Sequence, residues 1–215
     1  MSNRILAFAI GFAGLGASLQ PTGAAAATSD DELWIETSVN GEIAPETGFK
    51  FELETRRRDG PDEYIVGAEV NTAVANGIAL GGGMEIHDED GFTEVRPYQQ
   101  VTIGIGKFDL RSRIEERFYD DSDQMALRLR QRVRFRTDIG AGFGGFASGE
   151  LLYQLRDRLN GGPSRIDQWR ANIGATREIA PGLDLTAGYL FIIRPRDNGA
   201  TSHTHVGQLS LSYDL

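Results

Sequence analysis

Two segments of this chain alternate between charged and apolar residues, and this alternation limits what they can fold into. In residues 125–138 (MALRLRQRVRFRTD), every second position from Arg128 to Arg136 is arginine, and the positions between them are mostly leucine, valine or phenylalanine. Residues 107–119 (KFDLRSRIEERFY) alternate in the same way. Successive side chains of a β-strand point to opposite faces, whereas helical spacing would spread the arginines around the whole circumference. Both segments are therefore predicted to be strands.

Eight further segments alternate similarly, and the lengths of all ten favour a membrane barrel. Strands of soluble sheets usually have about 5–6 residues, while a tilted membrane-spanning strand needs about 9–11. Each of the ten segments has at least nine residues. The predicted strands are 49–57, 64–74, 78–86, 92–103, 107–119, 125–138, 142–154, 168–179, 183–193 and 203–213.

The connections between these segments are expected to alternate between short and long. Short turns with glycine are predicted at 75–77, 104–107, 139–141 and 180–182, and longer polar links at 58–63, 87–91, 120–124, 155–167 and 194–202. Short turns on one rim and longer loops on the other are typical of antiparallel outer-membrane barrels, with the short turns in the periplasm. Ten strands starting at Phe49 and ending at Tyr213 would place both ends of the barrel on the periplasmic rim.

The segment 34–43 (WIETSVNGEI) also alternates and would make an eleventh strand. Bacterial barrels of this type have even strand numbers, so we predict ten strands, with twelve as the alternative. Three placements of this segment stay open: pairing at the seam of the barrel, folding into the lumen, or belonging to a twelve-stranded barrel. The predicted organisation is thus an N-terminal segment at 28–48, with a possible extra strand, and an all-β barrel at 49–215.

The arginine-bearing face is predicted to be the interior of the barrel. An arginine on the lipid face at the bilayer midplane costs about 2–4 kcal/mol, so Leu129 and Phe135 should face lipid and Arg132 and Arg134 the lumen. Buried charges need partners, and arginine pairs with carboxylates in two-point geometry. The expected partners are Glu52 and Glu54 for Arg56, Glu94 for Arg96, and Asp109 and Glu115 for Arg111, Arg113 and Arg117. The residues expected to line the lumen, as an ion-pair ladder or a pore, are Glu52, Glu54, Arg56, Glu94, Arg96, Arg111, Arg113, Glu115, Arg117, Arg128, Arg130, Arg132, Arg134, Arg136 and Glu150.

The start of the chain has the pattern of an export signal. Arg4 precedes an apolar run at 5–19, and small residues at 24–27 resemble a cleavage site, which together are typical of a signal peptide at 1–27. The chain has no cysteine and a formal net charge of −9. These properties argue against disulfides and zinc fingers and against nucleic-acid binding, which needs a positive surface. The bacterial outer membrane is the expected location.

The strand motifs also resemble a known family. FELETRRR, FTEVRPYQQ, SGELLYQL, QWRANIGATREI and LTAGYLFI, and above all RSRIEERF followed by RLRQRVRFR, are similar to the bacterial family catalogued as domain of unknown function number 2490. The resemblance runs from about Trp34 to the C-terminus. It implies an outer-membrane barrel and transfers no catalytic residue, because the family has no established activity.

The sequence predicts no catalytic residue, no metal site and no cofactor. Barrel enzymes of the outer membrane use histidine as a base, and the three histidines are His87, expected in an exterior loop, and His203 and His205, at the start of the last strand. These are expected to be incidental, so the protein is predicted not to be an enzyme.

Three functions therefore stay open. The first is a structural or interaction barrel whose lumen is filled by its own ion pairs, the second a narrow anion-preferring pore, and the third a lipid-modifying enzyme or protease using the histidines. The first is preferred. The expected partners are outer-membrane lipid and, during biogenesis, the barrel-assembly machinery. The barrel is expected to be a monomer and to bind no nucleic acid.

Overall fold

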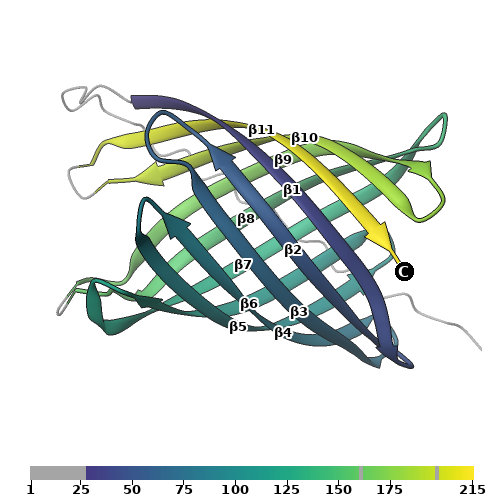
Figure 1. Cartoon of the computed structure of the whole chain (residues 1–215), viewed down its shortest axis with the longest axis horizontal. Helices are drawn as coiled ribbons and strands as arrows, with labels where there is room; N and C mark the ends of the chain where they lie inside the picture. Colours follow the sequence, from purple (N-terminus) through teal and green to yellow (C-terminus); the bar gives the residue numbers. More distant parts are fainter. Residues whose placement is uncertain (1–27, 160–161, 197–198) are drawn as a thin grey trace, which may run out of the picture.

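The computed structural model describes residues 28–159, 162–196 and 199–215, which form one closed β-barrel (Figure 1). The predicted signal peptide at 1–27 lies outside the described residues. No helix in the described part of the chain is long and apolar enough to cross a membrane. The strands are β1 (Thr28–Ala44), β2 (Thr47–Arg57), β3 (Glu63–Ala75), β4 (Ile78–Glu89), β5 (Phe92–Ile105), β6 (Phe108–Tyr119), β7 (Ser122–Gly140), β8 (Phe143–Arg156), β9 (Arg165–Ala180), β10 (Leu183–Pro195) and β11 (Thr201–Asp214).

The barrel has eleven strands among the described residues, so the predictions of ten and of twelve are both wrong. The segment 34–43 is part of β1, which lies between β2 and β11 (Figure 1). Consecutive strands pair antiparallel, but β1 pairs parallel with β11, with Thr37 opposite Leu211. An odd number of hairpin-connected strands can close only through one parallel pair. The sequence prediction of a wholly antiparallel barrel therefore fails at this seam.

The odd strand number also corrects the predicted position of the ends. β1 starts at the same rim as β11, beside Ser202, whereas β11 ends at the opposite rim, beside the tight turn that contains Gly182. Figure 1 shows the start of β1 and the C-terminus at opposite ends of the barrel. The described chain thus enters at one rim and leaves at the other.

The rim formed by the turns β1–β2, β3–β4, β5–β6, β7–β8 and β9–β10 has only two-residue connections; we call it the short-turn rim. Gly77 and Gly182 have φ values of 73° and 71°, a backbone conformation that favours glycine and suits tight hairpins. The other rim, which we call the long-loop rim, carries the longer connections 58–62, 157–164 and 196–200, so the two rims differ as the sequence predicted.

Two of the links predicted to be long are tight turns as well. β4 continues to Glu89 and β5 starts at Phe92, which leaves only Asp90 and Gly91 between them. Both have positive φ, 50° and 80°, as in the Asp-Gly hairpin turn that joins strands most tightly. The link at 120–124 shortens to Asp120 and Asp121. The acidic composition of these segments suggested loops, but their alternation continues almost to the turn.

The two faces of the barrel wall differ sharply in polarity. Apolar side chains cover the outer face, where Phe51, Leu53, Val66, Val133 and Ile173 are between 48% and 61% exposed. Charged and polar side chains fill most of the inner face, apart from an apolar cluster of Trp34, Leu190, Ile192 and Val206 on β1, β10 and β11. Leu129 and Phe135 lie on the outer face of β7, opposite in parity to Arg132 and Arg134, which line the interior.

We predict that cysteines introduced at Thr37 and Leu211, which are direct neighbours on the outer face, will crosslink in the folded barrel. Leu53 lies on the other side of Thr37, two strand spacings from Leu211, or about 9–10 Å, which is too far for a disulfide. Thr37→Cys with Leu211→Cys should therefore crosslink on oxidation, measured by electrophoresis under non-reducing conditions. Efficient crosslinking of the control pair Leu53→Cys with Leu211→Cys would instead indicate a ten-stranded barrel without β1.

Candidate functional site

The candidate site is the interior of the barrel, where the structure places the fifteen residues singled out from the sequence. Eleven line a central cavity of about 400 Å³: Glu52, Glu54, Arg56, Arg96, Arg111, Arg113, Arg128, Arg130, Arg132, Arg134 and Glu150. Glu94 and Arg117 line an outer pocket of about 350 Å³ toward the long-loop rim, and Glu115 is buried within the wall of side chains. Arg136 lines a vestibule of about 1120 Å³ at the short-turn rim, with its side chain 63% exposed.

The strand register brings opposite charges together on the inner face. Glu63 lies opposite Arg56 on the neighbouring strand, and Glu115 lies opposite Arg128. Directly opposed residues of an antiparallel pair are close enough for their side chains to interact. Alternation within each strand and register between strands are therefore sufficient to build ion pairs around the wall.

These pairs join into one network, which we call the ion-pair belt. Its members come from seven consecutive strands, β2 to β8, and are connected by hydrogen bonds and ion pairs. The belt consists of Glu54, Arg56, Glu63, Glu85, His87, Glu94, Arg96, Arg113, Glu115, Arg117, Arg128, Arg130 and Glu150.

Glu115 is the most enclosed carboxylate of the belt, with none of its side chain exposed. Its Oε2 lies 2.7 Å from Arg128, its Oε1 lies 2.7 Å from Arg130, and Arg113 approaches the same Oε1 to 3.9 Å. A carboxylate removed from water is expensive unless several charged donors replace its solvation. Arg128 and Arg130 supply those donors, and Arg113 adds a third positive charge close by.

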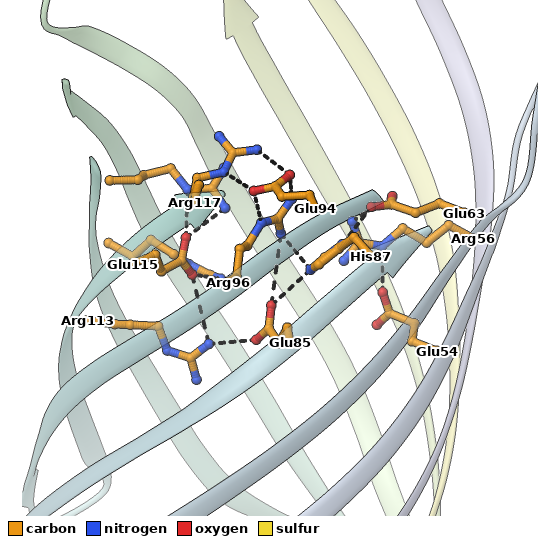
Figure 2. A network of polar contacts seen from close by, with 12 residues as sticks. Glu54, Arg56, Glu63, Glu85, His87, Glu94, Arg96, Arg113, Glu115 and Arg117 are labelled. Carbon is orange, nitrogen blue, oxygen red and sulfur yellow. Dashed lines mark hydrogen bonds and ion pairs between the residues drawn. The ribbon is translucent and has the colours of Figure 1, made fainter. Parts of the chain in front are cut away.

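His87 connects the two halves of the network drawn in Figure 2. Its Nδ1 lies 2.7 Å from Glu63, and its Nε2 lies 2.8 Å from an amino group of Arg96. The same Nε2 also lies 3.1 Å from Glu85 Oε2, so the ring joins Glu63 on one side to Arg96 and Glu85 on the other. Arg96 also forms a two-point pair with Glu94 at 2.6 and 2.7 Å. Glu94 in turn accepts bonds from Arg117.

An aromatic contact closes the gap between the two ends of the belt. The Arg56 guanidinium lies 3.8 Å from the ring centre of Trp34, and that of Arg170 lies 5.6 Å from it. Arg170 is also 3.9 Å from Glu150, the last member of the belt. Because cations are attracted to the face of an indole ring, Trp34 on β1 links Arg56 of the belt to Arg170 on β9. Polar contacts therefore connect β1 through β9, while β10 and β11 contribute the apolar cluster.

Some carboxylates pair with other cations than the sequence suggested. Glu52 was expected to neutralise Arg56, but it lies 2.6 Å from Lys50. Asp109 was expected to serve the arginines of its own strand, yet it lies 2.6 Å from Arg136 on β7. Glu52 pairs within its own strand and Asp109 with a diagonal neighbour on the adjacent strand, so partner choice depends on side-chain conformation, which the alternation does not encode.

Sequence reasoning missed several inner-face residues. His87 was expected in an exterior loop, and this prediction is wrong: it lies in β4, is buried and belongs to the belt. Glu63 was assigned to a long link but begins β3. The parity of the flanking strands could have found both, since each continues the inner-face series. The other missed residues that line the central cavity include Glu36, Lys50, Glu69, Glu85, Tyr98 and Arg170.

The histidines do not come together. His203 and His205 stack against Phe191 with ring centres 5.6 and 5.1 Å apart, and His205 also hydrogen-bonds Tyr189. In β11 the buried residues at 202, 204 and 206 face inward, so His203 and His205, which lie between them, are on the outer face. His87, in contrast, points inward. Among the described residues, no group of three His, Cys, Asp or Glu side chains is placed to hold a metal ion.

We predict that Glu115→Gln will lower the free energy of unfolding by about 3–5 kcal/mol, because it leaves buried arginines without their carboxylate. Urea unfolding of the refolded protein in detergent micelles would measure the change. The control is Asp121→Asn, which removes an exposed ion pair with Arg158 at the rim and should change stability by less than about 0.5 kcal/mol. Equal effects of the two substitutions would contradict the structural role of the belt.

Comparison with known proteins agrees with the strand motifs. The model of the family described as proteins of unknown function (DUF2490) matches residues 31–203. An uncharacterised protein of Methylorubrum extorquens strain AM1 is 27% identical over 177 residues, which cover 75% of this chain and 77% of the relative. The resemblance inferred from the motifs is confirmed, and the chain belongs to the DUF2490 family.

Proposed function

We propose that this protein is a bacterial outer-membrane β-barrel closed to solutes by its ion-pair belt, with a structural or interaction role. The belt is the observation that carries this proposal. Three arginines of the belt, Arg56, Arg96 and Arg128, line both the central cavity and the outer pocket, as does Arg170, so these side chains lie between the two spaces. Because the three belt arginines are held by carboxylates on their own or neighbouring strands, moving them aside would break several buried ion pairs.

The size of the barrel is consistent with this closure. Barrels of about 8 strands have interiors that side chains just fill, whereas porins with about 16–18 strands leave an aqueous channel. Eleven strands fall between these limits, and the long arginine side chains compensate for the wider interior. Trp34, Leu190, Ile192 and Val206 occupy the part of the wall that the belt does not reach.

Three features support the membrane location. The outer face is apolar, strands of 11 to 19 residues match or exceed the length needed to cross the hydrocarbon layer, and the closed order of the strands leaves no unpaired edge. We propose outer-membrane lipid as the principal partner, a monomeric state, and delivery by the barrel-assembly machinery after removal of the signal peptide. The short-turn rim would face the periplasm.

A narrow anion-preferring pore is the second candidate, and the charge of the central cavity favours it. Ten basic and six acidic residues line this cavity among the residues described. Even when the buried Glu115 is added, positive charges remain in excess, and rings of arginine favour anions in pores. The belt opposes conduction, so we rank this function below the closed barrel. We propose no enzymatic activity.

We predict that the purified protein will insert into planar bilayers without stable conductance steps. Replacing one pair of the belt, Glu115→Ala with Arg128→Ala, removes two buried side chains of opposite charge and should join the two cavities into a conducting path. The control, Asp121→Ala with Arg158→Ala, removes an exposed pair at the rim and should stay silent. Stable anion-selective steps from the unmodified protein would reject the closed barrel in favour of the pore.

We predict that Val133→Arg will reduce folding into lipid vesicles much more than Arg132→Gln. Val133 lies mid-strand on the outer face and is 48% exposed, where an arginine would cost about 2–4 kcal/mol in lipid. Arg132 lies one residue away on the inner face. The folded fraction can be measured by heat-modifiable electrophoretic mobility. Equal folding of both variants would argue against a lipid-facing outer wall.

A further inference from the structure

One part of the inner wall holds more arginines than the nearby carboxylates can neutralise. Arg111 on β6, Arg132 and Arg134 on β7, and Arg170 on β9 line the central cavity side by side, and we call these four the basic patch. In register, Arg111 lies opposite Arg132, which in turn lies opposite Glu150, the neighbour of Arg170. Arg111, Arg132 and Arg170 thus lie around one carboxylate, Glu150, and Arg134 lies two residues further along β7, opposite Ser148.

The nearby acidic groups are already engaged. Glu150 forms an ion pair with Arg111 at 2.9 Å and lies 3.9 Å from Arg170. It also forms a two-point pair with Arg130 at 3.0 and 3.1 Å. Asp109 lies opposite Arg134 in the register, yet its carboxylate lies 2.6 Å from Arg136. Neither group is left to neutralise the patch.

Arg132 and Arg134 consequently lack an anionic partner among the described residues. Arg132 forms neither a hydrogen bond nor an ion pair with them, and Arg134 only stacks over the Phe146 ring at 4.2 Å. The Nε atoms of Arg111, Arg132 and Arg134 are buried and have no acceptor in the part of the chain that the structure describes. Leaving a buried charged donor without an acceptor is costly, so the geometry points to an acceptor that comes from outside the protein.

We propose that the basic patch is a binding site for the phosphate group of a small soluble anion, either inorganic phosphate or a phosphate ester. Arginines bind phosphate oxygens through paired N–H donors, and several unneutralised arginines suit an anion of more than one charge. Ser148 and Asn172, which are neighbours on β8 and β9 and also line the cavity, add neutral polar groups. A volume of about 400 Å³ accommodates a small solute.

The ligand would enter through the vestibule at the short-turn rim. Arg134, Lys50 and Glu36 line both the vestibule and the central cavity, whereas belt side chains separate the cavity from the outer pocket. The vestibule is the larger space, at about 1120 Å³. That this entrance faces the periplasm rests on the proposed function, but the site itself does not.

Titration of the refolded protein with inorganic phosphate in detergent micelles tests this proposal. Isothermal calorimetry should detect saturable binding of one phosphate per chain, which chloride at the same ionic strength does not reproduce. Arg132→Gln with Arg134→Gln should weaken binding at least tenfold, whereas Arg158→Gln, at an exposed ion pair on the rim, should leave it unchanged. Glycerol phosphate, titrated in the same way, distinguishes an ester from the free anion, and saturable binding of either supports the site.

Urea unfolding provides a second measurement of phosphate binding, which does not depend on calorimetry of the double variant. Removing two unneutralised charges should not destabilise the barrel without phosphate, while phosphate should raise the urea midpoint of the unmodified protein only. Absence of saturable binding by both anions, or equal binding by the double variant, would overturn the site. Neither result depends on a bilayer or on current, so failure here is distinct from failure of the closed-barrel proposal.

Discussion

The cross-strand pair of a carboxylate and an arginine on the inner face is the interaction on which the rest of this barrel depends. A narrow barrel cannot solvate many charges, so each inward arginine requires an acceptor supplied by a neighbouring strand. Glu115, fully enclosed by Arg113, Arg128 and Arg130, is the clearest case. Where this requirement is satisfied, the side chains form the belt that we propose closes the interior; where it is not, as at Arg132, the wall carries the unneutralised charge on which the proposed anion site rests.

The same interaction specifies the register of the strands. A slip by one residue would turn every inner-face charge of a strand to the outer face and every apolar residue inward. Both changes are unfavourable, because the belt would lose its ion pairs and the apolar outer face would gain charges. In some proteins, buried ion pairs contribute less to stability than to such specificity. In β7, where arginines alternate with apolar residues, the ion pairs favour one register over a slip by one residue.

Much of the fold could be predicted from local pattern, because period-two alternation determines both strand identity and facing. The family resemblance and the polar interior with its apolar exterior followed from the same strands. The strand number could not be predicted, since the place of β1 depends on a parallel pairing with residues about 170 positions away. His87 was misplaced because acidic neighbours suggested a loop, although an Asp-Gly turn follows it. The partners of Asp109 and Glu52 depend on side-chain conformation, which the alternation of a strand does not specify.

The odd number of strands has a consequence for biogenesis. In a barrel of hairpins alone, both ends stay in the compartment from which the chain is delivered, and only loops cross the bilayer. Here the start of β1 and the end of β11 lie at opposite rims, so in a membrane they belong to different compartments. In the proposed membrane setting, insertion would carry the chain at the start of β1 or at the end of β11 through the hydrocarbon layer, and the parallel seam between β1 and β11 would form only after this translocation.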